Sequence, residues 1–302
     1  MTRRLFIFGL GFSGLEIAKL ARAQGWTVAG TCTTEEKARG LREAGIEAHR
    51  FDGTAALAPD AFGETTHVVC TIAPGEGDPV LRTCRALLGR ARWLGYLSTT
   101  GVYGSHDGGW VDETTPTLPT QARSQQRLAA EQGWRDLASA AGASLHLLRL
   151  PGIYGPGRST LDRVKAGTAQ RIDKPGQVFS RIHVEDLAAS ALKAMDRAGT
   201  EIWNVADDLP ASNADVIAYA CELLGRPVPP AIPWDEAAPA MSPMARSFYS
   251  ENRRVKNDKL KRELGVMLRY PTYREGLTAI LLARPTKPSP RSGEAFSPPR
   301  AG

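Results

Sequence analysis

The chain has 302 residues, of which 42% are hydrophobic and 23% charged, a composition typical of a soluble globular protein. Its apolar runs are all shorter than the roughly 18 residues that a membrane-spanning helix needs, so we expect a cytoplasmic protein with no membrane partner. Half of the net charge of +6 lies in residues 284–302, which are rich in proline, serine and glycine, so we expect a disordered basic tail there and no nucleic-acid partner.

In the first half of the chain, short apolar runs alternate with segments of helical periodicity. The apolar runs predict strands over residues 4–8, 27–31, 48–51, 67–71, 93–98 and 144–150. The segments between them predict helices over residues 14–24, 34–44, 79–91 and 124–141. This alternation predicts an α/β fold in which residues 1–150 form a doubly wound parallel sheet of the Rossmann type.

After residue 150 the alternation weakens. We expect strands near residues 178–182 and 202–206, and helices over residues 184–196 and 213–224. A proline-rich loop over residues 227–243 and a helical region from residue 257 follow. Residues 151–283 are therefore expected to contribute the last strands of the sheet and a small C-terminal substrate lobe.

The cysteines and histidines show no spacing typical of a metal site. The four cysteines are scattered along the chain at Cys32, Cys70, Cys84 and Cys221, and the five histidines are equally dispersed. We expect free thiols in a reducing compartment and no bound metal.

A glycine-rich turn, G-L-G-F-S-G over residues 9–14, follows the first expected strand and opens a helix. In such a turn Gly9 allows a tight bend, Gly11 lets the backbone approach a pyrophosphate, and Gly14 lets the helix pack closely on the strand. The helix N-terminus, with the N–H groups of Phe12 and Ser13, attracts the phosphates. The turn therefore predicts a bound NADP(H) or NAD(H).

The end of the second expected strand bears on which dinucleotide binds. A site for NAD(H) usually places an acidic residue there to hold the ribose 2′-hydroxyl, but the strand ends at Thr31 without one. Thr33 and Thr34 can donate to a 2′-phosphate and Lys37 can add positive charge, although Lys37 is equally suited to a solvated helix surface. We therefore expect NADP(H) to be favoured over NAD(H), although Glu35 and Glu36 count against this preference unless they point away on the helix that follows.

Two further residues are expected beside the cofactor. Asp52 follows the third strand and can accept a hydrogen bond from an adenine amino group, or it can cap a turn. Thr71 closes the fourth strand, at the same sheet edge as the glycine turn.

Three later segments carry a family resemblance. They are LSTTGVYG over residues 97–104, RLPGIYGPG over residues 149–157 and IHVEDLA over residues 182–188. With the glycine turn, they make residues 3–282 resemble the extended short-chain dehydrogenase/reductases, the NAD-dependent epimerase/dehydratase family. The resemblance implies that Thr99 hydrogen-bonds the reacting oxygen of the substrate and that Pro151 and Ile153 line the nicotinamide.

The resemblance also implies substrate-binding roles for several residues of the second half. Tyr154 closes the RLPGIYGPG segment, and Arg246, Arg253 and Arg254 lie where family members often place basic residues that bind the substrate. A solvated surface position is an equally good interpretation of each of these arginines.

The sequence departs from the family at its Tyr-x-x-x-Lys pair, whose positions fall on Arg123 and Arg127. Arginine does not donate a proton at neutral pH, because its pKa lies above about 12. Arg127 can still hold the ribose, and both guanidinium groups can bind an anionic substrate. Tyr103 and His183 are two candidates to restore proton transfer, although structural roles fit both.

Two functions remain open at this point. The first is an oxidoreductase or epimerase acting on a small anionic or sugar-type substrate, with Thr99, Tyr103 and Arg127 as candidate catalytic residues. The second is a non-catalytic protein that senses the dinucleotide and has lost catalysis together with the tyrosine. The resemblance also implies a homodimer formed through the helices over residues 79–91 and 124–141, although the polar Gln125 and Gln126 speak against that surface.

Overall fold

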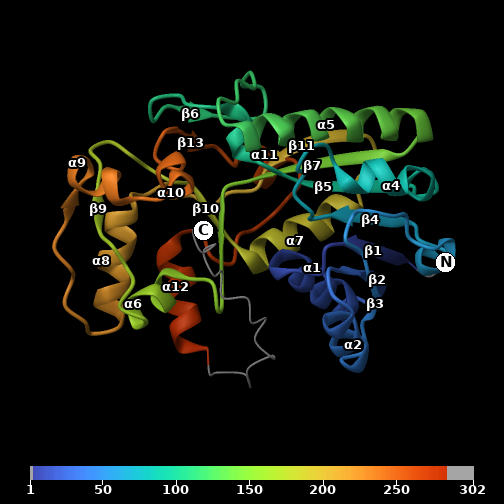
Figure 1. Cartoon of the computed structure of the whole chain (residues 1–302), viewed down its shortest axis with the longest axis horizontal. Coiled ribbons are helices and arrows are strands. Elements are labelled where there is room, and N and C mark those ends of the chain that lie inside the picture. The colour runs from blue at the N-terminus through green and yellow to red at the C-terminus, as the bar shows by residue number, and fades with distance from the viewer. Residues whose placement is uncertain (1–2, 284–302) are drawn as a thin grey trace, which may run out of the picture.

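A seven-stranded parallel sheet forms the centre of the computed structural model, which describes residues 3–283 (Figure 1). The strand order is β11-β7-β5-β4-β1-β2-β3, so the chain turns back between β1 and β4. The strands are β1 (Arg4–Phe8), β2 (Thr27–Cys32), β3 (Glu47–Arg50), β4 (His67–Cys70), β5 (Trp93–Thr99), β7 (Ser144–Leu150) and β11 (Thr200–Asn204). This order confirms the doubly wound Rossmann sheet, and its reversal is the place where such folds bind ligands. The expected disordered tail lies outside the described residues.

Helices cover both faces of the sheet (Figure 1). On one face lie α1 (Phe12–Ala23), α2 (Glu35–Glu43) and α7 (Val184–Met195), which share an apolar core that includes Ile17 and Leu187. On the other face lie α3 (Pro59–Phe62), α4 (Pro79–Leu88) and α5 (Ala122–Ala141), whose core includes Val80 and Trp134. Burial on both faces explains the continuous apolar runs of the strands.

The second lobe lies beside the carboxyl ends of the strands, at the left of Figure 1. Its main helices are α6 (Thr160–Lys165), α8 (Asn213–Leu223) and α12 (Tyr273–Leu282), which pack around Leu161 and Ile217. Short elements complete the lobe and its junction with the sheet: η1 (Thr100–Tyr103), β6 (Trp110–Val111), β8 (Gly152–Tyr154), β9 (Ile172–Asp173), β10 (Arg181–His183), β12 (Ile232–Pro233), α9 (Trp234–Ala237), η2 (Ala238–Ala240), α10 (Pro243–Ser247), β13 (Arg254–Val255) and α11 (Asp258–Arg262).

The boundaries differ from expectation mainly in this lobe. The strand expected at residues 178–182 begins at Arg181, where it pairs with β8 outside the main sheet. The strand expected at residues 202–206 is β11, which begins at Thr200 because it pairs with Leu145 of β7. The expected loop over residues 227–243 contains β12, α9 and η2. Within residues 3–283, no helix is both long and apolar enough to cross a membrane.

A buried ion pair fixes α5 on the sheet. The carboxylate of Glu131 accepts two hydrogen bonds from Arg149 of β7, at 3.1 and 2.9 Å, and one from Ser98 of β5 at 2.6 Å. The side chains of Glu131 and Arg149 are 0% and 3% exposed. Arg135 of α5 also donates to Glu131, at 3.2 Å, so removing Glu131 is the change that would leave buried Arg149 without a counter-charge. The pair holds α5 over β5 and β7.

Candidate functional site

The three glycines of the first turn occupy three different environments. Gly9 has a φ of +98°, and a Cβ there would lie 2.4 Å from Thr71 Oγ1. A Cβ on Gly14 would lie 2.1 Å from the carbonyl oxygen of Gly9, which shows how closely α1 approaches β1. A Cβ on Gly11 would meet nothing within 4 Å. The turn thus leaves an open cradle at Gly11, which fits a pyrophosphate.

Two threonines from neighbouring strands hold the turn in this shape. The N–H of Gly9 donates to Thr31 Oγ1 at 3.0 Å, and Thr71 Oγ1 donates to the carbonyl oxygen of Gly9 at 2.7 Å. Thr31 is fully buried. Both threonines, which were expected beside the cofactor, therefore contact the backbone of the glycine turn.

The N-terminus of α1 is open to an anion. Gly11 is its N-cap and provides no side-chain hydrogen bond, and the first turn, which includes Phe12 and Ser13, has no acidic residue. The ring of Phe12 lies under the guanidinium of Arg158, 5.4 Å from the ring centroid. Gly155 packs on the same ring, because its Cβ would lie 3.1 Å from Phe12 Cζ. Phe12 therefore links the glycine turn to the β8 segment of the second lobe.

The residues expected at the adenosine end lie around the end of β2. Thr33 and Thr34 are exposed, and Thr34 Oγ1 accepts a hydrogen bond from the N–H of Lys37 at 3.3 Å, so Thr34 caps α2. Glu35 forms an ion pair with Arg42, along its own helix. The Thr33 hydroxyl is therefore free of helix capping, whereas Thr34 is committed to it.

Asp52 closes a turn of its own. Its Oδ1 accepts hydrogen bonds from the hydroxyl of Thr54 at 2.6 Å and from the Thr54 N–H at 3.0 Å. Its Oδ2 accepts one from Arg50 at 3.1 Å. The hydrogen bonds from Thr54 lower the pKa of the Asp52 carboxyl. Of the two roles considered from the sequence, the structure provides the contacts of the turn cap.

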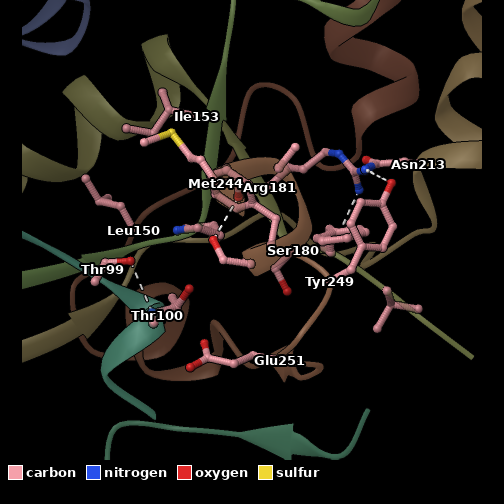
Figure 2. Close-up of a pocket in the computed structure, with 18 of the residues that line it drawn as sticks. Thr99, Thr100, Leu150, Ile153, Ser180, Arg181, Asn213, Met244, Tyr249 and Glu251 are labelled. Atoms are coloured by element: carbon pink, nitrogen blue, oxygen red, sulfur yellow. Dashed lines mark hydrogen bonds between the residues drawn. The ribbon is translucent and has the colours of Figure 1, made fainter. Parts of the chain in front are cut away.

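A cavity of about 890 Å³ lies between the ends of β5 and β7 and the second lobe (Figure 2). Thr99, Pro151 and Ile153, which the sequence placed together at the reacting end, all line it. The opposite wall comes from β10, the start of α8 and the segment over residues 241–249 that contains α10. Figure 2 shows Thr99 and Leu150 on one side of this cavity and Asn213 and Tyr249 on the other.

Two hydroxyl groups lie close to Gly101, at the end of the cavity formed by β5. Thr99 Oγ1 accepts a hydrogen bond from the Gly101 N–H at 3.1 Å, so its own proton is available to a substrate oxygen. A Cβ on Gly101 would lie 3.3 Å from Thr99 Oγ1 and 2.5 Å from Ser124 Oγ. Ser124 is 3% exposed and lines the cavity. The sequence did not single out Ser124, because its hydroxyl comes close to Gly101 only through the rotation of α5.

The two arginines of α5 also line the cavity. The guanidinium of Arg123 stacks on the ring of Phe248, 4.2 Å from its centroid. Arg127 donates a hydrogen bond to the carbonyl oxygen of Leu97 and lies 5.7 Å from the ring centroid of Tyr96. The pair therefore spans the cavity wall from β5 to the α10 segment.

Arginine dominates the charged side chains of the cavity. Glu251 is the one carboxylate among its lining residues. The lining also contains six arginines, which are Arg123, Arg127, Arg158, Arg163, Arg181 and Arg253. Arg253 pairs with Glu251 at 2.9 Å, and within residues 3–283 the other five have no carboxylate within 4 Å. Such a cavity attracts an anionic ligand.

Five other candidates lie outside the lining of the cavity, among them Arg254, which donates a hydrogen bond to the carbonyl oxygen of Gly108. Tyr103 is fully buried, and its hydroxyl donates to Asn204 Oδ1 at 2.7 Å. The Tyr154 hydroxyl donates to the carbonyl oxygen of Thr272 at 3.4 Å. His183 caps α7, and Arg246 donates to the carbonyl oxygen of Ala238. The structure therefore gives each of these side chains a partner within the fold.

Known proteins resemble this chain in sequence and in structure. The sequence pattern of the NAD dependent epimerase/dehydratase family matches residues 77–206. The Escherichia coli (strain K12) protein YeeZ is 30% identical over 218 residues, which are 67% of this chain and 77% of that protein.

Two solved structures extend the likeness to nearly the whole chain. A functionally unknown conserved protein from Silicibacter pomeroyi DSS has 46% sequence identity and a TM-score of 0.82, covering 92% of this chain and 98% of that one. The UDP-glucose 4-epimerase of Thermus thermophilus, in complex with NAD, has 20% identity and a TM-score of 0.72, covering 91% and 96%, and shares the fold. These similarities confirm the resemblance drawn from the motifs: the chain belongs to the NAD dependent epimerase/dehydratase family.

Proposed function

We propose that this protein is an NADP(H)- or NAD(H)-dependent oxidoreductase or epimerase that acts on a small anionic substrate. The observation that carries the proposal is the cavity itself, in which the hydroxyl of Thr99 lies among arginines that lack carboxylate partners. The name of the family and the NAD complex of the Thermus epimerase support the choice of cofactor. We further propose a cytoplasmic homodimer, on the expectations drawn from the sequence.

The cofactor would be held mainly by the backbone of the glycine turn. The open cradle at Gly11 and the uncapped N-terminus of α1 suit the pyrophosphate. Pro151 and Ile153 would flank the nicotinamide, and Thr33 with Lys37 would face the adenosine ribose. We favour NADP(H), because the end of β2 carries no carboxylate to bind a 2′-hydroxyl.

The cofactor supplies or accepts a hydride when bound. Thr99 and Ser124 would donate hydrogen bonds to the substrate oxygen, and so stabilise the negative charge that develops there. Arg123 and Arg127 would attract and orient the anionic substrate, since guanidinium groups stay protonated at neutral pH. Tyr103 has no place in this mechanism, because its hydroxyl is bound to Asn204.

A non-catalytic dinucleotide sensor is the second candidate. It is favoured by the arginines at the two positions of α5 where the resemblance implies tyrosine and lysine. Tyr249 is the one tyrosine among the cavity residues, and Figure 2 shows it on the side away from Thr99. A sensor would bind the dinucleotide tightly and turn over no substrate.

Cofactor oxidation by the purified protein tests the proposal. NADPH or NADH would be supplied with aldehydes and ketones that carry a carboxylate or a phosphate, and NADP+ or NAD+ would be supplied with UDP-glucose, whose hydroxyl groups can only give up a hydride. We expect NADPH or NADH to be oxidised with at least one aldehyde or ketone that carries a carboxylate or a phosphate. Thr99→Ala and Arg123→Gln should each lower kcat/KM for that compound by at least about tenfold.

Arg226→Gln is the matched control, because Arg226 donates to the carbonyl oxygens of Val164 and Lys165 outside the cavity. Tight cofactor binding without turnover of any compound would favour the sensor. If neither dinucleotide binds, both candidate functions are wrong.

A further inference from the structure

Arg181 of β10 is a buried cation in the wall of the cavity. It is 9% exposed and lines the cavity beside Asn213 and Tyr249. Figure 2 shows this group of side chains on the side of the cavity away from Thr99. Arg181 and Thr99 therefore lie on different sides of the cavity, and Arg181 has no role in the chemistry proposed at Thr99.

All hydrogen-bond partners of Arg181 are neutral. Its Nη1 donates to the carbonyl oxygens of Phe179 and Ala211, at 2.7 and 2.9 Å, and its Nη2 donates to Asn213 Oδ1 at 2.8 Å. Among the residues that the structure describes, no carboxylate lies within 4 Å of its guanidinium, and its Nε donates to no acceptor. Nε and Nη2 form one edge of the guanidinium, the geometry that binds both oxygens of an oxyanion.

Asp207 is the carboxyl group whose charge acts most strongly on the pKa of Arg181. It is 1% exposed, and its Oδ2 has no hydrogen-bond partner among the described residues. Burial raises the pKa of Asp207 to about 8. Burial also lowers the pKa of Arg181. A buried guanidinium without an anionic partner is costly, and a bound anion would remove that cost.

We propose that Arg181 binds an oxyanion group, a carboxylate or a phosphate, at the end of the ligand opposite its reacting carbon. The proposal rests on the proposed function, because it assigns one end of the same cavity. The aromatic rings of Phe179 and Tyr249, which meet edge to face at 5.2 Å, form the wall beside this oxyanion site. The substrate is therefore an elongated acid whose anionic group and reacting carbon occupy opposite sides of the cavity.

Calorimetric titration of the full chain with inorganic phosphate and, separately, with succinate tests the proposal and distinguishes the two anions. We expect at least one of them to bind in chloride buffer, and Arg181→Met to weaken it by about tenfold or more. Asn213→Asp keeps the acceptor for Nη2 and adds an internal carboxylate, so it should weaken the same anion by about tenfold. Arg226→Met is the control, since Arg226 also bonds only carbonyl oxygens and lies outside the cavity.

Asn213→Asp also keeps the test informative if Arg181→Met does not fold, because an ion pair with Arg181 should raise the melting temperature. Anion binding that is equal in wild type and both variants would overturn the proposal, as would the absence of binding by either anion. These outcomes are separate from the proposed function, because the titration needs neither cofactor nor turnover. A protein that oxidises NADPH but binds no anion at Arg181 would retain its function and lose this oxyanion site.

Discussion

Gly11→Ala and Gly14→Ala should separate cofactor binding from folding within one turn. At Gly11 the φ is −91° and an added Cβ meets no atom within 4 Å, so the free energy of unfolding should change by less than about 1 kcal/mol. At Gly14 the Cβ would lie 2.1 Å from a backbone oxygen, so α1 must move away from β1. We expect that movement to cost about 2 to 3 kcal/mol.

The affinity for the cofactor should fall in Gly11→Ala, the variant whose stability changes little. The methyl group of Gly11→Ala would occupy the space into which the pyrophosphate must come, so the affinity for NADPH should fall by about tenfold or more, equal to about 1.4 kcal/mol. Urea unfolding measures the stability of both variants, and titration of NADPH by its fluorescence measures binding.

Two results would refute the reasoning behind this pair. If Gly11→Ala binds NADPH as tightly as wild type, the open space at Gly11 is not the pyrophosphate site. If Gly14→Ala is as stable as wild type, the contact between α1 and β1 is not as close as the structure shows.

Three further predictions concern the cofactor, the core and the pH dependence. Thr33→Asp should weaken NADPH relative to NADH by about tenfold, because a carboxylate repels a 2′-phosphate and accepts from a 2′-hydroxyl; an unchanged ratio in paired titrations would remove the argument for NADP(H). Glu131→Gln should lower the free energy of urea unfolding by about 3 kcal/mol, because it leaves Arg149 buried without a counter-charge, whereas the exposed Glu43→Gln should change it by less than about 0.5 kcal/mol. Burial lowers the pKa of His146 to about 4, from about 6.5 in an unfolded chain. Between these two pH values the unfolded state binds a proton that the folded state does not bind. The free energy of unfolding therefore falls as the pH falls from about 6.5 to about 4. His146→Gln should therefore show a shallower loss of stability between about pH 7 and about pH 5, and an identical slope in both proteins would contradict the assignment.

The sheet and the glycine turn could be predicted because both depend on local sequence. Strands covered on both faces need continuous apolar runs, and a turn with a φ of +98° at Gly9 needs glycine. The expected strands over residues 4–8 and 144–150 match β1 and β7 at both ends. The short strands outside the main sheet are two or three residues long and take their boundaries from pairing with distant segments, which a local pattern does not contain.

The candidate site was only partly predictable, because its geometry depends on contacts between distant residues. Thr99, Arg123 and Arg127 were expected at the cavity from the family motifs, and the structure places all three in its lining. Ser124 was missed, because its place beside Thr99 follows from the rotation of α5. Arg181 was also missed, since a single arginine in a short strand carries no local sign of burial.

The ion pair of Glu131 separates the support of α5 from the chemistry of its cavity face. Glu131 lies two turns beyond Arg123 on α5, and its partners are Ser98 of β5 and Arg149 of β7. The side chains of α5 that line the cavity can therefore change during evolution while the helix keeps its position on the sheet. One inherited scaffold can in this way host reactions that need a phenol and an amine, and others that need two guanidinium groups.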